Sequence, residues 1–491
     1  GDHRDLHSFP TRRSSDLEGL LEVWRPVLAA LADRLVSQGP RGLEGLGDDR
    51  WAVLAGHEPQ LQIPELPPVP RLASPATRQR LVEALRAALR CLAEPGPVVV
   101  VLDDLQWADE LSLAAIEQLD GAFFAAEPVT LLATFRSEEA GPELWALATR
   151  ADATSIALGA LPPEAVVEMI RDMLALDAPP PALLELVDRE AEGNPFFVAE
   201  YLLLALAEGV LGRGEDGVWR LAAGSVEAVT TLPPPRGLAE VVARRLARLT
   251  PEGRGLAELC AVLGREIDGR LLAALADGEE APHALEELRR RQIVEEAGQG
   301  RLRFVHDQLR EGVYRGLPTA RRVALHRRVA ASLEATGGDA AVLAHHFDAG
   351  ELVAPARRYA VLAGEEALDR GAAALARRHL ERAQELAESV GASAASRRRS
   401  ARLLGEACYD LGDLEAADAH LREALGPALG PTLSAAAALA AGVARFRRDP
   451  DRGRGPLEDV VRAMERLAQV DYFSHRPRMA FLHSLAGATG A

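Results

Sequence analysis

The feature that most constrains the fold is a run of five apolar residues, VVVVL at positions 98–102, which ends at two carboxylates, Asp103 and Asp104. Four of the five are β-branched, and a continuous apolar run is typical of a parallel strand buried on both faces. A helical pattern follows at 109–119, and a second apolar run lies at 129–134. This alternation of strand, helix and strand predicts an open α/β sheet.

Two adjacent carboxylates at the C-terminal end of a buried strand form the Walker B arrangement. The carboxyl ends of parallel strands face the ligand crevice of an open α/β sheet. We therefore predict that Asp103 holds Mg²⁺ or its water shell, and that Asp104 is the catalytic base that orients the attacking water. The motif alone leaves a second interpretation open, in which a carboxylate only caps the turn that follows the strand.

The chain contains no lysine, so all 56 of its strongly basic residues are arginine. A phosphate-binding loop of the form GxxxxGKS/T needs its lysine to reach the β and γ phosphates of a nucleotide. The sequence therefore carries the Walker B half of a nucleotide site without the Walker A half.

Both ends of the sequence indicate truncation. The chain begins at Gly1, and residues 8–17, SFPTRRSSDL, look like one reading frame of a sequencing adapter. We therefore treat residues 1–17 as an artefact and exclude them from the fold. A natural disordered tail is the alternative interpretation. Ala491 ends a stretch that still has a helical pattern, and we expect truncation there as well.

Beyond residue 160 the strand patterns give way to helical ones. The three prolines at 233–235 cannot enter a helix and indicate a linker. Four helical patterns then precede two short strand patterns at 293–296 and 302–305. This order suggests a winged-helix unit that ends in a long helical stretch at 307–335.

The C-terminal third of the sequence repeats itself, because five residues recur with the same shift of 41 positions. The pairs are Gly364 and Gly405, Gly371 and Gly412, Ala376 and Ala417, Leu380 and Leu421, and Ala383 and Ala424. Small residues at these offsets let paired helices touch, which is the tetratricopeptide (TPR) pattern, so we predict a helical solenoid. A third copy near Gly442 is weaker, and a coincidence between Ala-rich helices is the alternative.

Four segments resemble the STAND class of signal-transduction ATPases, the branch that includes MalT-like and large LuxR-type regulators. Residues 102–109, LDDLQWAD, resemble its Walker B segment, and residues 134–139, TFRSEE, resemble its sensor 1. Residues 192–198, EGNPFFV, resemble its GNPFF box, and residues 304–307, FVHD, resemble the closing part of its winged-helix domain. Several separated motifs in the family's order are more specific than any one alone.

The resemblance implies nucleotide contacts for further residues. Arg136 would contact the γ phosphate as sensor 1. Gly193, Asn194 and Pro195 would present backbone to the adenine, and His306 would sense the β phosphate. Without the resemblance, each residue has a simpler interpretation. Arg136 would be a solvated arginine in a loop, residues 193–195 would be an ordinary turn between helices, and His306 would be a capping or core histidine.

The expected architecture is multidomain. It comprises a truncated α/β P-loop NTPase core with Walker B and sensor 1 at 18–160, a helical lid with the GNPFF box at 161–235, a winged-helix domain at 236–335, and an incomplete α-helical TPR-like solenoid at 336–491. The resemblance implies that ADP holds the first three domains closed and that exchange for ATP opens them. The repeats would bind an inducer or a protein partner and bias this equilibrium.

The parent protein implied by the resemblance is a slow cytoplasmic ATPase that uses ATP, ADP and Mg²⁺ and is able to form a nucleotide-dependent oligomer. It would regulate transcription or signalling through an output domain not present in this sequence. The fragment itself is expected to be inactive, since its Walker A loop is absent. The alternative function is a TPR-type protein-binding scaffold with a degenerate NTPase core.

Composition argues against other classes of function. Acidic residues outnumber basic ones by 73 to 56, for a net charge of −17, and the arginines are spread along the chain. DNA contact is therefore expected only through a domain absent from this sequence. The apolar runs fall far short of the roughly 20 residues that span a bilayer. Cys91, Cys260 and Cys408 lie far apart, which excludes disulfide or metal-ligand spacing and indicates buried thiols in a reducing compartment.

Overall fold

The computed structural model describes residues 21–64, 66–69, 74–175, 179, 181–207, 209, 211–213, 219–221, 243, 245–276, 280–298, 300–425 and 450–473. The chain divides into two compact units. The first combines Gly1–Ala153 with Thr319–Ala491, and the second is Thr154–Pro318.

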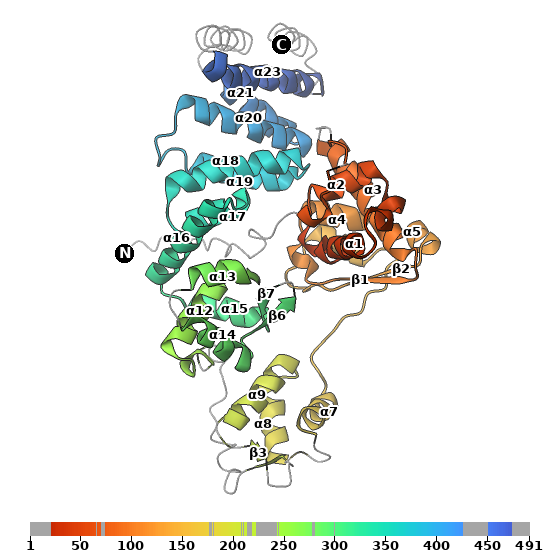
Figure 1. Cartoon of the computed structure of the whole chain (residues 1–491), viewed down its shortest axis with the longest axis vertical. Coiled ribbons are helices and arrows are strands. Elements are labelled where there is room, and N and C mark those ends of the chain that lie inside the picture. The colour runs from red at the N-terminus through yellow and green to blue at the C-terminus, as the bar shows by residue number, and fades with distance from the viewer. Residues whose placement is uncertain are drawn as a thin grey trace. The chain divides into compact units, whose positions relative to one another are not determined.

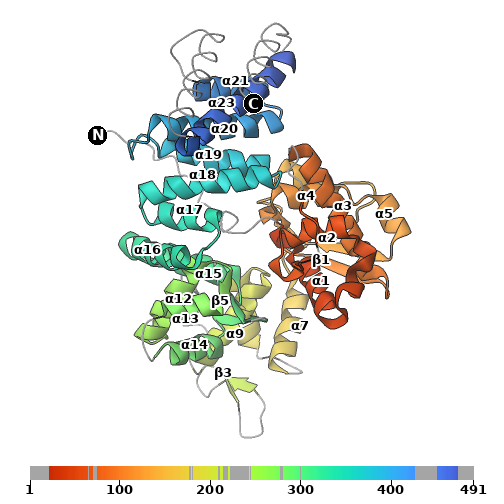
Figure 2. The same ribbon diagram turned by 45° about the horizontal axis from the view of Figure 1, so that its top comes forward.

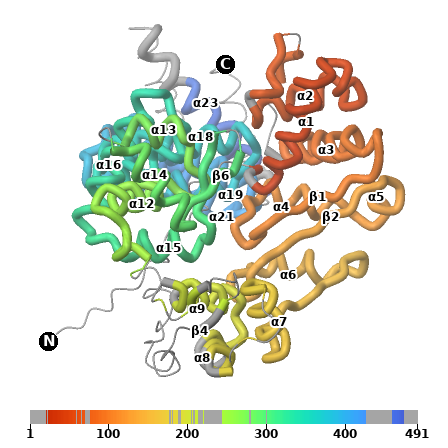
Figure 3. The backbone as a smooth tube through the Cα atoms, turned by 60° about the horizontal axis from the view of Figure 1, so that its bottom comes forward, coloured from red at the N-terminus to blue at the C-terminus, as the bar shows by residue number. Residues whose placement is uncertain are grey.

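The N-terminal part of the first unit is a small parallel sheet with helices around it (Figures 1 and 3). Its helices and strands are η2 (Glu22–Trp24), α1 (Arg25–Gln38), η3 (Pro40–Leu46), α2 (Asp48–Ala55), η4 (Pro59–Leu61), α3 (Ser74–Ala93), β1 (Val98–Leu102), η5 (Leu105–Trp107), α4 (Glu110–Glu117), α5 (Gly121–Ala126), β2 (Val129–Ala133) and α6 (Pro142–Ala148). Strands β1 and β2 pair in parallel, with Val98 opposite Val129 and Leu102 opposite Ala133. The predicted strand, helix and strand are thus confirmed.

Strand β1 differs from the prediction in its burial. Val100 and Leu102 are buried, as expected, but Val99 is 65% exposed and Val101 is 50% exposed. The prediction that this strand is buried on both faces is therefore wrong for the described part of the chain. Val99 and Val101 alternate with Val100 and Leu102 along the strand, so they share the face of β1 that the described residues leave uncovered.

The C-terminal part of the first unit is a stack of helices (Figure 2). They are α16 (Thr319–Thr336), α17 (Ala340–Ala349), α18 (Val353–Asp369), α19 (Ala373–Glu385), α20 (Ala394–Asp410), α21 (Leu414–Leu425) and α23 (Pro450–Phe473). Each of the helices from α16 to α21 packs against the next along the chain. The sequence repeat corresponds to two helical pairs, α18 with α19 and α20 with α21.

The repeated glycines are the points where these paired helices touch. A Cβ atom on Gly364 would lie 2.5 Å from Cγ of Leu380, and one on Gly405 would lie 2.6 Å from Cγ of Leu421. Both leucines are fully buried. The same close contact therefore occurs in both repeats, which confirms the predicted helical array. The weaker third copy near Gly442 lies outside the described residues.

The second unit is built from helices and short antiparallel strands (Figure 1). Its elements are α7 (Pro163–Leu174), α8 (Pro181–Ala191), α9 (Pro195–Ala207), β3 (Leu211–Arg213), β4 (Trp219–Leu221), α12 (Pro251–Leu263), β5 (Glu266–Asp268), α13 (Gly269–Leu275), α14 (Ala281–Arg290), β6 (Val294–Gly298), β7 (Arg301–Phe304) and α15 (Asp307–Gly316). Strands β3 and β4 form a hairpin, and β5, β7 and β6 form an antiparallel sheet in that order.

Three details of this unit depart from the sequence analysis. The segment expected to be entirely helical contains the hairpin of β3 and β4, and β5 was not expected. The helical stretch expected at 307–335 is two helices, α15 and α16, interrupted at Leu317 and Pro318 because proline has no N–H to continue a helix. The proline linker at 233–235 lies outside the described residues.

The sequence also led to predictions about membrane-spanning segments and the three cysteines. No described helix is long and apolar enough to cross a membrane. Cys91, Cys260 and Cys408 are all buried free thiols, as predicted. Complete burial raises the pKa of Cys260 to about 12, so this thiol stays protonated and unreactive.

Candidate functional site

Thr134 joins the C-terminal ends of the two parallel strands. Its N–H donates to the carbonyl of Leu102 at 3.0 Å, and its carbonyl accepts from the N–H of Leu105 at 2.8 Å. These bonds extend the parallel ladder one residue past β2. The loop that follows β1 is therefore fixed against the loop that follows β2.

The Thr134 hydroxyl also links the two carboxylate residues. It donates to Oδ1 of Asp103 and accepts from the backbone N–H of Asp104 at 3.1 Å. Asp104 has a left-handed backbone, with φ of 57°, which aspartate tolerates better than most residues. Thr134 was not predicted as a site residue, because a threonine directly after a strand gives no signal by itself.

Arg136 lies beside Asp104, with Gln106 between their loops. The Gln106 amide donates to Oδ1 of Asp104 at 3.0 Å and accepts from the N–H of Arg136 at 3.0 Å. The guanidinium of Arg136 lies 4.0 Å from Oδ1 of Asp104 and 5.2 Å from the ring centre of Trp107. The structure thus brings Arg136 together with the pair Asp103 and Asp104, which were predicted from a different motif, and Gln106 is a further member that was not predicted.

The side chains of this site can supply oxygen ligands for a magnesium ion, but they lack a cationic loop that would bind the phosphates of a nucleotide. Asp103 is exposed, and its carboxylate and the Thr134 hydroxyl are hard oxygen donors of the kind that Mg²⁺ prefers. The phosphate half of such a site needs a lysine in a glycine-rich loop, and the sequence has no lysine. The residues present therefore offer oxygen ligands for a divalent cation, and the chain has no lysine with which to hold a phosphate.

Residues 192–194 form a tight turn between α8 and α9, and residues 195–198 are the first residues of α9. Gly193 has φ of 73°, and a Cβ there would lie 2.4 Å from the carbonyl oxygen of Leu161, so the backbones of the two segments touch. The side chain of Asn194 accepts from the N–H of Phe196 at 3.0 Å, and Pro195 begins α9. This geometry explains why the turn needs Gly, Asn and Pro. Whether these residues also contact adenine stays a prediction.

His306 lies against the start of α9. It precedes α15, and its ring meets that of Phe196 edge-to-face with 4.9 Å between centroids. Partial desolvation and the guanidinium of Arg245 lower the pKa of His306. The second unit therefore brings the GNPFF segment and the FVHD segment into contact, although they lie far apart in the sequence.

Arg245 is the charged member of this cluster. Its guanidinium bonds both carboxylate oxygens of Glu200 on α9 and donates to the carbonyl of Gln292 at 3.1 Å. The side chains of Arg245 and Glu200 are only 16% and 6% exposed. Burial raises the pKa of Glu200, and the Arg245 charge opposes this. Neither residue stood out in the sequence, because each lies in an ordinary helical pattern.

Comparison with known proteins gives a domain match and two distant similarities. The family model for the AAA ATPase domain matches residues 8–129, a range that includes Asp103 and Asp104 but stops before Arg136 and begins within the adapter-like segment. An uncharacterized protein of Rhizobium meliloti (strain 1021) is 26% identical over 337 residues. This alignment covers 65% of the chain and 31% of the relative, so the chain spans about a third of the relative's length.

A solved structure gives the other similarity. It is a STAND protein with a tetratricopeptide repeat sensor from Pyrococcus horikoshii, 14% identical in sequence. The alignment covers 84% of the chain and 54% of that protein, with a TM-score of 0.42.

Proposed function

We propose that the chain is part of a nucleotide-dependent switch of the STAND ATPase class, and that it carries the Walker B and sensor 1 side of an ATP site. The observation that supports this most directly is the network of Asp103, Thr134, Asp104 and Arg136 at the adjacent ends of two parallel strands. The match of residues 8–129 to the AAA ATPase domain supports the same class.

In the proposed site, each residue has a role that its contacts suit. Asp103 and Thr134 would hold Mg²⁺ or its waters through oxygen atoms. Asp104 would orient the attacking water, with Gln106 fixing its carboxylate. Arg136 lies between the carboxylates of Asp104 and Glu139, and a γ phosphate would compete with them for its charge. Bound Mg²⁺ and ATP would supply the phosphoryl chemistry itself.

The phosphate-binding loop belongs, in this proposal, to sequence of the whole protein that this chain does not contain. The exposed side chains of Val99, Val101 and Leu132 support an incomplete sheet, because a P-loop core normally has layers on both faces. The chain as given would then bind ATP weakly and would not hydrolyse it.

The second unit would contribute the nucleotide-sensing lid, at 161–235, and most of the winged-helix domain. Gly193, Asn194 and Pro195 would meet the adenine, and His306 would report the β phosphate. Their support is the direct contact of His306 with Phe196, which directly follows Pro195. The order of α12, β5, α13, α14, β6 and β7 is helix, strand, two helices and a strand pair, which supports assigning this part as a winged-helix domain.

The helical repeats would receive the signal. A pocket of about 240 Å³ lies between α17, α18 and α19, and charged side chains of both signs line it, among them Asp348, Arg378, Arg382 and Glu385. An inducer or a peptide of a protein partner would bind there and shift the ADP-closed and ATP-open states. We place the whole protein in the cytoplasm, with gene regulation or signalling as its output.

The test is nucleotide binding by the full-length protein, restored from the complete gene. We expect a fluorescent ADP analogue to bind with Mg²⁺, and Asp103→Ala to weaken the Mg²⁺-dependent part of binding by at least about tenfold. Glu143→Ala on α6, another exposed carboxylate, serves as the control and should leave binding unchanged.

A binding scaffold with a degenerate NTPase core is the second candidate, and the absence of lysine favours it. The same experiment separates the two functions. If the restored wild type and its Asp103→Ala variant both fail to bind ADP and ATP, the scaffold is correct and the switch is not.

A further inference from the structure

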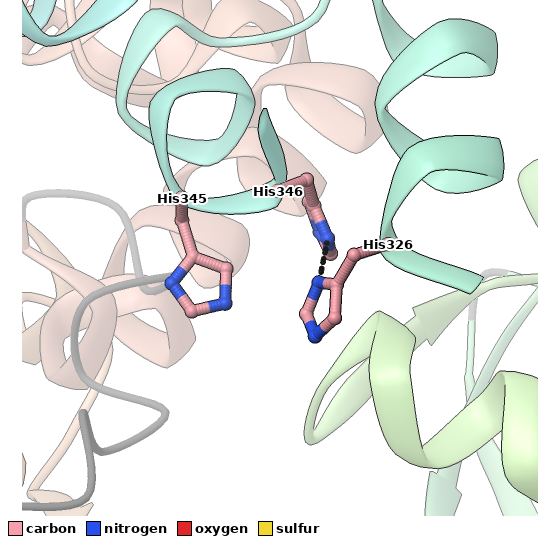
Figure 4. A group of neighbouring side chains, drawn as sticks. All are labelled: His326, His345 and His346. Atoms are coloured by element: carbon pink, nitrogen blue, oxygen red, sulfur yellow. Dashed lines mark hydrogen bonds between the residues drawn. The ribbon is translucent and has the colours of Figure 1, made fainter. Parts of the chain in front are cut away.

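Three histidines gather between the first two helices of the repeat array. His326 comes from α16, and His345 and His346 are neighbours on α17 (Figure 4). The Nδ1 atoms of His326 and His346 lie 2.9 Å apart. One ring nitrogen from each of the three histidines lies within 4.8 Å of the other two. No other group of this kind occurs among the described residues.

We infer that His326, His345 and His346 form a binding site for a divalent transition-metal ion, with Zn²⁺ as the best fit. Imidazole nitrogen binds Zn²⁺, Cu²⁺, Ni²⁺ and Co²⁺, whereas Mg²⁺ and Ca²⁺ require oxygen ligands that this group lacks. Three protein ligands leave one position of a tetrahedral ion for water or another donor. This site is separate from the strand ends that carry Asp103 and does not depend on the proposed function.

The ring nitrogens lie close to the separations that a tetrahedral zinc ion requires. Zn–N bonds of about 2.0–2.1 Å place the nitrogens of a tetrahedral site about 3.3 Å apart. His326 and His346 would separate by a few tenths of an ångström, and His345 would move inward by a side-chain rotation. Such shifts are small for rings at the interface where α16 packs against α17.

The surroundings hold two of the rings in place and leave the third accessible. His326 and His346 are 0% and 1% exposed. Packing in the helical array therefore fixes where the nitrogens of these two rings lie. His345 is half-buried and also lines the pocket between α17, α18 and α19, which provides a route for the ion.

A plain packing role predicts different behaviour from a metal site. A hydrogen bond between His326 and His346 explains their short contact by itself, but it does not involve His345. Variants of His345 therefore distinguish the two roles. Because His345 is half-buried, His345→Gln should leave the fold intact, whereas substitution of a fully buried ring risks the core.

The experiment uses the full chain, stripped of metal by a chelator and titrated with Co²⁺ alone and then with Zn²⁺ in competition. We expect one equivalent of Co²⁺ to give the intense visible absorption of a four-coordinate ion, and Zn²⁺ to displace it. His345→Gln and His326→Gln should each weaken Co²⁺ binding by about tenfold or more. His283→Gln, an exposed histidine on α14, is the matched control and should bind like the wild type.

Circular dichroism of each variant shows whether it is folded. X-ray absorption of the Zn²⁺-loaded protein counts the imidazole ligands directly, and three are expected. Unchanged Co²⁺ affinity in folded His345→Gln would overturn the proposal, as would a wild type whose Co²⁺ stays six-coordinate or binds at several equivalent weak sites.

Discussion

The ring of His306 meets the ring of Phe196 edge-to-face, with an interplanar angle of 85°. This contact joins the start of α15 to the start of α9. Beside it, the ion pair of Arg245 and Glu200 joins α9 to the segment that precedes α12. The second unit is therefore held at one place by an aromatic contact and a buried charge pair, both of which involve the first two turns of α9.

Substitution of Arg245 should destabilise α9 locally. In Arg245→Gln, the carboxylate of Glu200 would remain buried without its cation, and breaking a buried pair in this way costs about 3 kcal/mol. Hydrogen exchange of a peptide covering residues 195–207 measures this opening directly. We expect faster exchange there.

Glu200→Gln tests the cause of that effect. It removes the buried negative charge and keeps a similar shape, so exchange should accelerate less than in Arg245→Gln. Equal acceleration in the two variants would mean that packing, and not the unpaired charge, explains the loss.

Gly364→Ala should destabilise the contact between α18 and α19. Its Cβ would lie 2.5 Å from Cγ of the fully buried Leu380, and overpacking of this kind typically costs about 1–3 kcal/mol. The matched control is Gly316→Ala at the end of α15, where a Cβ meets nothing within 4 Å. Hydrogen exchange of α18 and α19 peptides reports the loss.

A second substitution shows whether the clash is responsible. Leu380→Ala leaves a cavity and is destabilising alone, but the added methyl group of Gly364→Ala would partly fill that space. The double variant should therefore lose less stability than the sum of the single variants. Simple additivity would argue against the contact.

His57 should make the fold sensitive to acid. Burial lowers the pKa of His57 from an ordinary 6.5 to about 4, so the unfolded chain takes up a proton at a higher pH than the folded one. Its contribution to stability is complete above pH 6.5 and is lost as the pH falls from about 6.5 toward 4. The check is the midpoint of urea denaturation as a function of pH, for wild type and His57→Gln.

The urea midpoint of His57→Gln should fall less steeply between these pH values than that of the wild type. Some decline should remain, because other histidines titrate in the same direction. A decline of the same steepness in both proteins would show that His57 is not a source of the acid sensitivity.

Asp109 should prove important for the start of α4. Its carboxylate accepts from the N–H groups of Leu111 and Ser112 at 2.9 and 3.1 Å, and it also accepts from the N–H of Leu21 at 3.0 Å. Asp109→Ala removes this cap and should cost about 1–2 kcal/mol. Asp109→Asn keeps an acceptor and should lose much less. Exchange rates in a peptide that covers α4 measure both variants.

The sequence predicted the local elements of the fold better than their surroundings. Strand β1 was predicted at its observed bounds because a run of β-branched residues ended by carboxylates has few alternatives. Its burial was not predicted correctly, since Val99 and Val101 depend on layers contributed from elsewhere. The strands β3 and β5 have three residues each, and such short strands are defined by distant partners rather than by a pattern of their own.

In the candidate site, too, residues with a local sequence signal were predicted and residues that depend on tertiary contacts were not. Asp103, Asp104 and Arg136 were identified because each ends or follows an apolar run with a characteristic string. Gln106 and Thr134 carry the hydrogen bonds between them, but a glutamine and a threonine in loops give no signal until the parallel pairing places the two loops together. The histidine group was missed for a similar reason, since His326 and His346 meet only when α16 folds against α17.

The contact of Gly364 with Leu380, and its copy at Gly405 and Leu421, has a consequence for how such a protein can change in length. Each contact lies within one helical pair, and each pair packs against the next helix of the stack. A 41-residue segment could therefore be duplicated or deleted as a block, leaving every remaining glycine opposite its own leucine. An insertion between Gly364 and Leu380, or between Gly405 and Leu421, would instead separate the partners, so these two stretches tolerate no change in length.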